Sequence, residues 1–388
     1  MDAAAATSAL GVSRGTLYAY VSRGLIRSTP HPSVAKASLY HAADVQALIA
    51  RKTRMRRPRA AAATALEFGL PVLKTHITHF EGDRLFYRAR DAIAFSREAT
   101  LEDAARLLWG SSDADPFQAQ RFDPREIAGW NEIAARFQLP QAPDRASALL
   151  PLLTAREAPV GFRPNAHAFG AGARLVQAVV AAIAGIGRPI DGPLHQAVAA
   201  AWSKPKAADV IRRSLVLLAD HELNASTFAV RVVASTGARL THCVMGGLAA
   251  VSGPRHGGAS DRLRAFLVGV ESEDDAVRAV AERLQRGERL PGFGHIFYRE
   301  EDPRAVELLS VIKADSVMST VLEAGRAMSG LEPNVDFALM AVERSFRLPE
   351  GAALALFAMG RSVGWLAHAF EQRASGALIR PRAEFVPE

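Results

Sequence analysis

The chain has 388 residues, of which 49% are hydrophobic and 22% charged, a balance typical of a globular protein with room for two or three domains. Its single cysteine, Cys243, excludes an internal disulfide and a cysteine-rich metal site, and no N-terminal secretory pattern is visible. The longest apolar run, residues 175–187, is shorter than the roughly 20 residues that span a bilayer. We therefore expect a cytoplasmic protein with no membrane segment and with Cys243 as a small core residue.

Positive charge is concentrated at the N-terminus. Residues 1–60 carry ten Lys and Arg against two Asp and Glu, whereas the rest of the chain carries 37 against 38. This asymmetry is typical of a nucleic-acid-binding module joined to a neutral body. A solvated basic linker would explain the charge equally well, so the charge alone leaves both interpretations open.

Within this basic segment, apolar residues recur at helical spacing in two short runs on either side of Gly11-Val12-Ser13. Ser13 is a suitable N-cap for a second helix beginning at Arg14, and two helices joined by a short glycine-containing turn form a helix-turn-helix. The second helix would expose side chains that can reach phosphates and base edges, namely Ser13, Arg14, Thr16, Tyr18 and Arg23.

The motifs "GVSRGTLYAYVSRGLI" and "LYHAADVQAL" make residues 1–52 resemble the winged helix-turn-helix domain of MerR-type regulators. The resemblance implies that this segment binds duplex DNA. A small helical accessory domain without DNA binding is the alternative.

Beyond this domain, the chain is predicted to be largely helical. Residues 53–65 are expected to form a basic linker, and residues 69–91 alternate around Glu81-Gly82-Asp83, which predicts a small β-hairpin near residues 70–90. Helical periodicity then dominates, for example in residues 100–110, 173–186, 208–223 and 351–374. The body is therefore predicted to be all-α.

Three histidines and one aspartate stand in unusual surroundings. His221 lies in "LLADHELNAST", His256 in "GPRHGGAS", and His295 follows a Pro-Gly-Phe-Gly turn. Asp336 lies in "EPNVDF", so we expect it near a helix N-terminus. Taken singly, each histidine could be a turn residue with a satisfied hydrogen bond, and Asp336 could be a helix cap.

Taken together and in this order, these residues resemble the citrate synthase family, including its 2-methylcitrate synthase branch. The resemblance covers about residues 66–388 and is carried by "DHELNASTFAVRVVASTGA", "GLAAVSGPRHGGA", "PGFGHIFYREEDPRA", "EPNVDF", "GRSVGWLAHAFEQ" and "RPRA". It implies the citrate synthase fold, with a large domain at 66–257 and 347–388 and a small domain at 258–346. It also implies a homodimer that needs no metal and no cofactor, because CoA enters as the thioester substrate.

The implied reaction condenses acetyl-CoA or propionyl-CoA with oxaloacetate and hydrolyses the thioester to give citrate or 2-methylcitrate and CoA. By resemblance, Asp336 removes a proton from the carbon beside the thioester, and His256 donates a hydrogen bond to the thioester oxygen. His295 would polarise the ketone of oxaloacetate. The sequence leaves the choice of acyl-CoA open.

The resemblance also assigns binding residues. The oxaloacetate end would be formed by His221, Asn224, Arg304, Arg361 and Arg380, since arginine forks match carboxylate geometry. Arg380 would reach the active site of the partner subunit. The recess for the CoA adenine would be formed by Leu290, Pro291, Gly292, Phe293 and Gly294.

Departures from the family pattern, Ala89 in place of the usual Gly among them, and rival interpretations accompany this assignment. Ser260 stands where the family usually has Asn, and Ile296 stands where many bacterial members carry Arg. One rival is a DNA-binding transcriptional regulator that uses the synthase fold to sense a metabolite. Such a sensor would need the arginines but not Asp336, so the presence of that carboxylate favours an enzyme.

Overall fold

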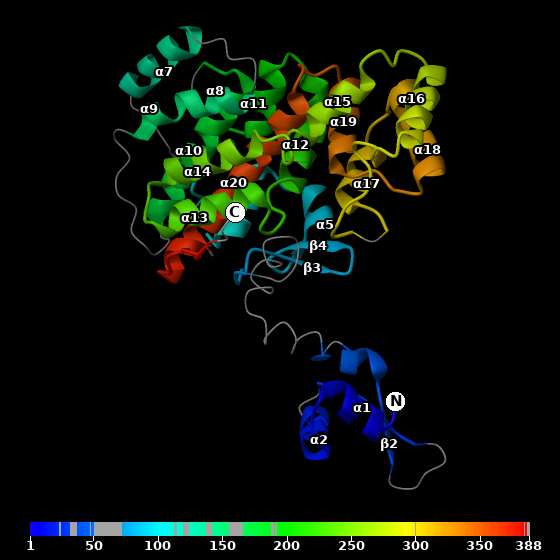
Figure 1. Ribbon diagram of the computed structural model, residues 1–388. Helices are drawn as coiled ribbons and strands as arrows, with labels where there is room; N and C mark the ends of the chain where they lie inside the picture. The colour runs from blue at the N-terminus through cyan, green and yellow to red at the C-terminus, as the bar shows by residue number, and fades with distance from the viewer. Residues whose placement is uncertain are drawn as a thin grey trace. The chain divides into compact units, whose positions relative to one another are not determined.

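The chain folds into two compact units, residues Met1–Lys74 and Thr75–Glu388, each with its own apolar core (Figure 1). This computed structural model describes residues 1–22, 25–31, 37–46, 48–49, 72–111, 115–118, 124–136, 142–154, 166–187, 190, 192–298, 300–383 and 385. The predicted linker, residues 53–65, lies outside the described residues.

The N-terminal unit begins with two short helices joined by a turn, α1 (Ala3–Leu10) and α2 (Arg14–Ser22). Gly11 ends α1 with φ 62°, a left-handed conformation that glycine adopts without steric cost. The Oγ of Ser13 accepts the backbone N–H of Thr16 at 3.3 Å. The predicted second helix and its N-cap are therefore confirmed.

A pair of strands and a further helical segment complete the described part of this unit. Strand β1 (Ser28–Pro30) pairs antiparallel with β2 (Ser38–Tyr40), and residues 42–46 and 48–49 are helical. Among the described residues, the core of the unit consists of Ala6, Leu10, Leu17, Ile26, Tyr40, Val45 and Leu48.

The second unit opens with the predicted hairpin. Strands β3 (Thr78–Glu81) and β4 (Arg84–Tyr87) pair antiparallel, and the short β5 (Arg90–Asp91) adds to β4. Gly82 takes φ 62° in the two-residue loop, as a tight hairpin turn requires. The buried hydroxyl of Tyr87 lies 2.9 Å from the carbonyl oxygen of Val216, which joins the hairpin to the helical body.

The rest of this unit is helical. In chain order, the elements are α5 (Ala92–Ser96), α6 (Leu101–Trp109), α7 (Pro124–Arg136), α8 (Ala142–Leu149), α9 (Pro151–Thr154), α10 (Ala166–Ala184), α11 (Leu194–Ala201), η1 (Pro205–Ala207), α12 (Ala208–Leu217), α13 (Ala225–Ser235), α14 (Leu240–Val251), α15 (Ala259–Leu267), α16 (Glu273–Gln285), α17 (Pro303–Ser310), α18 (Ser316–Ser329), α19 (Val335–Ser345) and α20 (Ala352–Ser375). The mostly helical body is therefore confirmed, and Cys243 lies buried on α14.

One predicted helix is too long. The periodicity of residues 208–223 suggested a single helix, but α12 ends at Leu217. Glu222 has φ 57°, which breaks a right-handed helix. The chain therefore turns just where His221 stands, and this turn brings His221 out of the helix and into the site.

Helix α20 is the centre of the core and packs against α6, α10, α12, α13 and α14. A Cβ added at Gly360 would lie 2.7 Å from the carbonyl oxygen of Leu215, so this glycine allows the close approach of α12. Both α10 and α20 are long and apolar enough to cross a membrane, contrary to the estimate from residues 175–187. Their most apolar windows are 78% and 94% buried inside the unit, as in core helices.

Helices α15 to α19 gather at one side of this unit (Figure 1). Among them, α16 packs on α18, and α19 packs on both α15 and α17. Helix α17 also contacts α5 and α12, and α19 contacts α20. Residues 258–346 therefore pack largely among themselves and touch the rest of the unit along a few helices.

Candidate active site

The Pro-Gly-Phe-Gly turn is built by two left-handed glycines and by pairing with the start of α19. Gly292 and Gly294 have φ 81° and 75°. The carbonyl of Gly292 accepts the N–H of Asn334 at 2.8 Å, and the N–H of Gly294 donates to the carbonyl of Glu332 at 2.8 Å. This pairing brings His295 beside the helix that carries Asp336.

Asp336 lies in the first turn of α19, as the sequence predicted. The helix is capped by Asn334, whose Oδ1 accepts the backbone N–H of Asp336 at 3.0 Å. Burial raises the pKa of the Asp336 carboxyl to about 6, although the positive charge of Arg304 acts in the opposite direction. Ser260 Oγ lies 3.5 Å from Asp336 Oδ1.

His295 and His221 lie together. Their ring centroids are 5.2 Å apart, and His221 Nε2 lies 2.9 Å from the hydroxyl of Tyr298. Burial lowers the pKa of His295 to about 4, with a further contribution from Arg304, and it lowers the pKa of His221 well below its usual range. Both rings are therefore neutral at pH 7.

The tautomer of His295 follows from its neighbours. Its Nδ1 accepts the backbone N–H of Phe297 at 3.1 Å, so the proton of the neutral ring must lie on Nε2. Arg304 Nη2 lies 3.5 Å from that Nε2. Two N–H groups therefore lie side by side, an arrangement that suits an oxygen carrying negative charge.

Arg304 is 2% exposed and held by its own helix cap. Its Nε and Nη2 donate to the two carboxylate oxygens of Asp302 at 2.9 and 2.8 Å. Asp302 Oδ2 also accepts the N–H of Val335 at 2.9 Å, which links α17 to the start of α19. One bidentate pair thus sets Arg304 relative to both His295 and Asp336.

His256 is held by a hydroxyl group. Its Nε2 lies 2.8 Å from Ser226 Oγ, which also accepts the indole N–H of Trp365 at 3.1 Å and lies 2.9 Å from Asn224 Oδ1. Burial lowers the pKa of His256 to about 4. When the serine proton points at Nε2, the proton of the neutral ring lies on Nδ1, which can then donate to another group.

Arg361 is fully buried on α20. Its Nε donates to the carbonyl of Leu218 at 2.8 Å, whereas its Nη1 has no hydrogen-bond partner among the described residues. Burial lowers the pKa of this guanidinium to about 10. An unpaired N–H of a buried cation is costly, so a bound anion would satisfy it.

A cavity of about 590 Å³ joins several of these parts. His256 and Asp336 line it together with Leu290, Pro291, Gly292 and Phe293. Four arginines also line it, namely Arg255, Arg262, Arg283 and Arg289. A larger cavity of about 1040 Å³, beside α5 and α6, contains none of the predicted site residues.

The structure therefore brings together most of the predicted site. Ring contacts, hydrogen-bond neighbours and the shared cavity connect five of them: His221, His256, His295, Arg304 and Asp336. Asn224 Oδ1 accepts the N–H of Thr227 as the cap of α13 and lies 2.9 Å from Ser226 Oγ, so the amide NH₂ is the group of Asn224 that can bind a substrate.

One predicted substrate-binding residue is not brought to this site. Arg380 is exposed in the segment after α20, outside the site of its own chain. Arg23 lies outside the described residues, while the other predicted DNA-contacting residues lie on α2 or at its cap, with Ser13, Arg14 and Tyr18 exposed.

Three site residues were not identified from the sequence. Tyr298 contacts His221, Asp302 holds Arg304, and Ser226 holds His256. An Asp followed by Pro is a recognisable helix start, so Asp302 could have been found as a cap. Ser226 and Tyr298 carry no such signal, because their partners lie 30 and 77 residues away.

Comparison with known proteins places this site in a family. The sequence model of the citrate synthase C-terminal domain matches residues 67–382. The chain belongs to the citrate synthase family. The family predicted from the motifs is therefore confirmed.

Two curated relatives illustrate the similarity of this citrate synthase family member. The putative citrate synthase 2 of Mycobacterium tuberculosis is 39% identical over 194 residues, which cover 47% of this chain and 52% of the relative. The 2-methylcitrate synthase of Shewanella oneidensis is 36% identical over 183 residues, covering 45% and 49%. The chain thus spans about half the length of the curated relatives it matches.

Solved citrate synthases share the fold. The crystal structure from Thermotoga maritima matches with a TM-score of 0.68 at 24% identity, covering 82% of this chain and 94% of that one. The citrate synthase of Thermoplasma acidophilum, solved with carboxymethyl coenzyme A and oxaloacetate, matches with a TM-score of 0.65 at 23% identity and the same coverage. The predicted citrate synthase fold is confirmed.

Proposed function

We propose that this protein condenses acetyl-CoA or propionyl-CoA with oxaloacetate and hydrolyses the thioester to release citrate or 2-methylcitrate and CoA. The observation that carries the proposal is that His256 and Asp336 line one cavity, with His295 and Arg304 next to them. A carboxylate base, a neutral donor for the thioester oxygen and donors for a second carbonyl are the groups this reaction needs.

Asp336 is the proposed base. Its raised pKa of about 6 gives a carboxylate that is ionised at neutral pH yet more basic than an exposed one. It takes a proton from the carbon beside the thioester while His256 Nδ1 donates to the thioester oxygen, where negative charge develops. Ser226 keeps the His256 proton on that nitrogen when its single hydroxyl proton points at Nε2 rather than at Asn224 Oδ1.

The 2-oxo acid is proposed to lie between the histidine pair and the arginines. His295 donates its Nε2–H to the ketone oxygen, which makes the carbonyl carbon a better electrophile for the enol. Arg304 and Arg361 bind the carboxylates, the latter through its Nη1, which no described residue engages, and His221 and Asn224 lie at the same end. No step in this scheme requires a metal or a prosthetic group.

The acyl-CoA is proposed to enter through the cavity of about 590 Å³. The loop Leu290–Gly294 forms the adenine recess, and the four arginines on the cavity wall offer positive charge to the CoA phosphates. Many bacterial family members carry Arg at the position of Ile296. In this chain the arginines of the cavity wall supply that positive charge instead.

We also propose the domain division and the dimer that the family pattern implies. Residues 66–257 and 347–388 form the large domain, residues 258–346 the small domain, and closure of the cleft between them excludes water. The protein acts as a homodimer in which Arg380 reaches the active site of the partner subunit. The exposure of Arg380 in a single chain is consistent with such a role.

The test is a steady-state assay of free thiol release across a panel of acyl-CoA and 2-oxo acid pairs. We expect thiol release that requires both acetyl-CoA or propionyl-CoA and oxaloacetate, and citrate or 2-methylcitrate as the detected product. Absence of turnover with every pair, with metabolite binding intact, would favour the regulator that senses a metabolite.

A second proposal concerns the N-terminal unit, which we infer to be a MerR-like winged helix-turn-helix domain that binds duplex DNA. The supporting observation is that α2 is capped by Ser13 and exposes Arg14 and Tyr18 in the most basic part of the chain. Phosphate contacts would make the affinity fall with salt, with a logarithmic slope of about −0.9 for each neutralised phosphate.

This second proposal is tested by electrophoretic mobility shift with genomic fragments at low salt. The full chain should shift DNA, and a variant that lacks residues 1–64 should not, while its thiol-release activity persists. Arg14→Ala should weaken or relax the binding. Equally poor DNA binding by the full and shortened chains would leave the unit as a packing or interaction module.

A further inference from the structure

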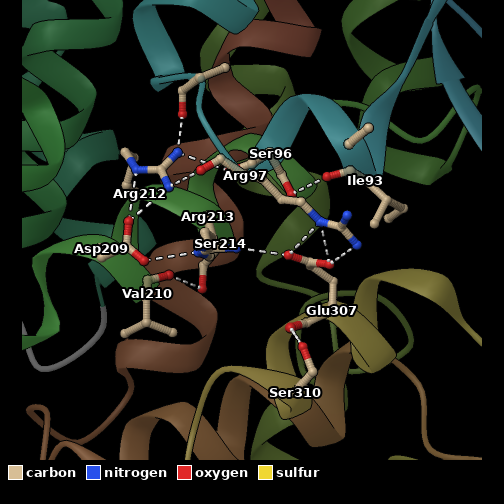
Figure 2. A network of polar contacts seen from close by, with 12 residues as sticks. Ile93, Ser96, Arg97, Asp209, Val210, Arg212, Arg213, Ser214, Glu307 and Ser310 are labelled. Carbon is tan, nitrogen blue, oxygen red and sulfur yellow. Dashed lines mark hydrogen bonds and ion pairs between the residues drawn. The ribbon is translucent and has the colours of Figure 1, made fainter.

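A cluster of charged side chains lies between α5, α12 and α17, outside the groups assigned to substrate (Figure 2). Glu307 of α17 is 5% exposed. Its Oε2 accepts Arg97 Nη2 at 3.0 Å, and its Oε1 accepts Arg213 Nη1 at 2.8 Å. These three residues, here named the Glu307 clasp, tie α17 to the end of α5 and to α12.

The side chain of Arg213 and the backbone of Arg97 are themselves held in place. Arg213 Nε donates to Asp209 Oδ2 at 2.9 Å, and Arg212 Nη2 donates to Asp209 Oδ1 at 2.8 Å. Arg212 also donates to the backbone carbonyl of Arg97 at 2.7 Å. Figure 2 shows this network, which joins α12 to the end of α5 on the side that receives Glu307.

Stability alone explains such a network poorly. Removing a carboxylate and two guanidinium groups from water costs free energy that their mutual attraction only roughly repays. What the clasp does provide is a fixed geometry for α17. This helix has only eight residues, and a helix that short takes its orientation from its tertiary contacts.

The same helix positions Arg304. Arg304 precedes Glu307 by three residues, so both side chains leave one face of α17. At the start of the helix, Asp302 holds Arg304 and accepts the N–H of Val335. A rotation of α17 about its axis would therefore move Arg304 Nη2 away from His295 Nε2, now 3.5 Å distant.

We propose that Glu307 is a positioning residue for the 2-oxo acid end of the site, acting through the clasp on α17 and Arg304. The inference rests on the proposed function of Arg304 as a ligand of oxaloacetate. Arg97 and Arg213 belong to the proposed large domain and Glu307 to the proposed small domain. The clasp thus sets the distance between the two walls of the cleft at the oxaloacetate end.

The test compares Glu307→Gln with a matched control, Glu371→Gln. Glu371 of α20 also binds an arginine, with its Oε2 2.6 Å from Arg231 Nη1, but that arginine belongs to α13. Displacements of about 1 Å at a reacting group can cost on the order of 10²-fold. We expect Glu307→Gln to raise the KM for oxaloacetate by about 5- to 50-fold.

The KM for acyl-CoA is the internal control, because no residue of α17 lines its proposed cavity. It should stay within about twofold of wild type, and Glu371→Gln should leave the KM for both substrates unchanged. A variant that merely loosened the fold would raise both KM values or lower the thermal midpoint without separating them.

Calorimetric titration of the full-length protein with oxaloacetate separates this inference from the proposed function. If wild type binds oxaloacetate and Glu307→Gln binds it at least fivefold more weakly, the clasp positions the site. Equal binding by the two proteins overturns the inference while the proposed function stands. If wild type neither binds nor converts oxaloacetate, the proposed function fails and the inference fails with it.

A milder variant covers the case in which Glu307→Gln does not fold. The side chain of Arg97 is 59% exposed, so Arg97→Ala removes one half of the clasp at small cost to the core. It should weaken oxaloacetate binding by a smaller factor in the same direction. Unchanged oxaloacetate binding in Arg97→Ala, with a lowered thermal midpoint, would assign the clasp to stability alone.

Discussion

Replacement of Asp336 by Asn tests the proposed chemistry most directly. The amide keeps the size of the side chain but cannot accept a proton from carbon. Loss of a general base commonly costs about 10²- to 10⁴-fold in turnover. We expect a loss of that size in thiol release, with oxaloacetate binding retained, because Arg304 and Arg361 are untouched.

The raised pKa of Asp336 adds a pH dependence with a defined sign. Only the ionised carboxylate can act as a base, so wild-type turnover should fall as the pH drops through about 6. This acid limb should be absent from the residual activity of Asp336→Asn.

The same shift predicts a change in stability. Burial raises the pKa from 3.8 to about 6, so the folded state binds the proton more tightly than the unfolded state does. The stabilising effect of that proton is fully present below the unfolded pKa and is lost as the pH rises through about 6. At 1.36 kcal/mol per pKa unit, the ionised carboxylate costs at most about 3 kcal/mol above that pH. Asp336→Asn should therefore be more stable than wild type at pH 8 and similar at pH 4.

The measurements are pH profiles of turnover and denaturant midpoints at both pH values. Turnover of Asp336→Asn within a few-fold of wild type would remove this residue from the mechanism. If Asp336→Asn shows the expected loss of turnover but is less stable than wild type at pH 8, the assignment of Asp336 as the base stands. The argument that burial of its carboxylate costs stability is then contradicted.

Three further predictions concern the groups around Asp336. Arg361→Ala should mainly raise the KM for oxaloacetate, because the arginine binds a carboxylate that is already charged in the substrate. His295→Ala should mainly lower kcat, because the histidine meets the negative charge that develops on the ketone oxygen during the reaction. Unchanged oxaloacetate kinetics in Arg361→Ala would contradict the assignment of that arginine. Ser226→Ala should lower kcat about tenfold, the equivalent of one hydrogen bond, and equal kcat would show that the histidine tautomer is set elsewhere. Gly292→Ala should raise the KM for acyl-CoA and lower the free energy of unfolding by about 1–3 kcal/mol. The reason is that φ is 81° and the new Cβ would lie 3.1 Å from neighbouring side chains. Gly287→Ala is the control for backbone strain alone, because its φ is 72° and the space around it is open.

Local signals in the sequence were sufficient for much of the fold. The hairpin at Gly82, the helix N-terminus before Asp336 and the N-cap at Ser13 all depend on residues within four positions of one another. Such features follow from turn chemistry and capping, which do not need the rest of the chain. The motif order likewise indicated the family, and the family model confirmed it.

The apolar periodicity of the sequence did not predict the end of α12, because long-range contacts determine where that helix ends. The apolar pattern of residues 208–223 continues past Leu217, yet α12 ends there as buried carbonyls turn to the hydroxyl of Tyr87, about 130 residues away. The left-handed Glu222 then turns the chain at His221. Nothing in the local pattern records a partner so distant in the chain.

The sequence by itself determined which residue types the site could use and in what order they occur. Only the tertiary structure decided their protonation and their neighbours. The low pKa values of His256 and His295 and the raised pKa of Asp336 arise from burial, which depends on how distant helices pack. The same holds for Arg361 Nη1, which lacks a hydrogen-bond partner among the described residues, and for Glu307, whose two arginines come from separate parts of the chain.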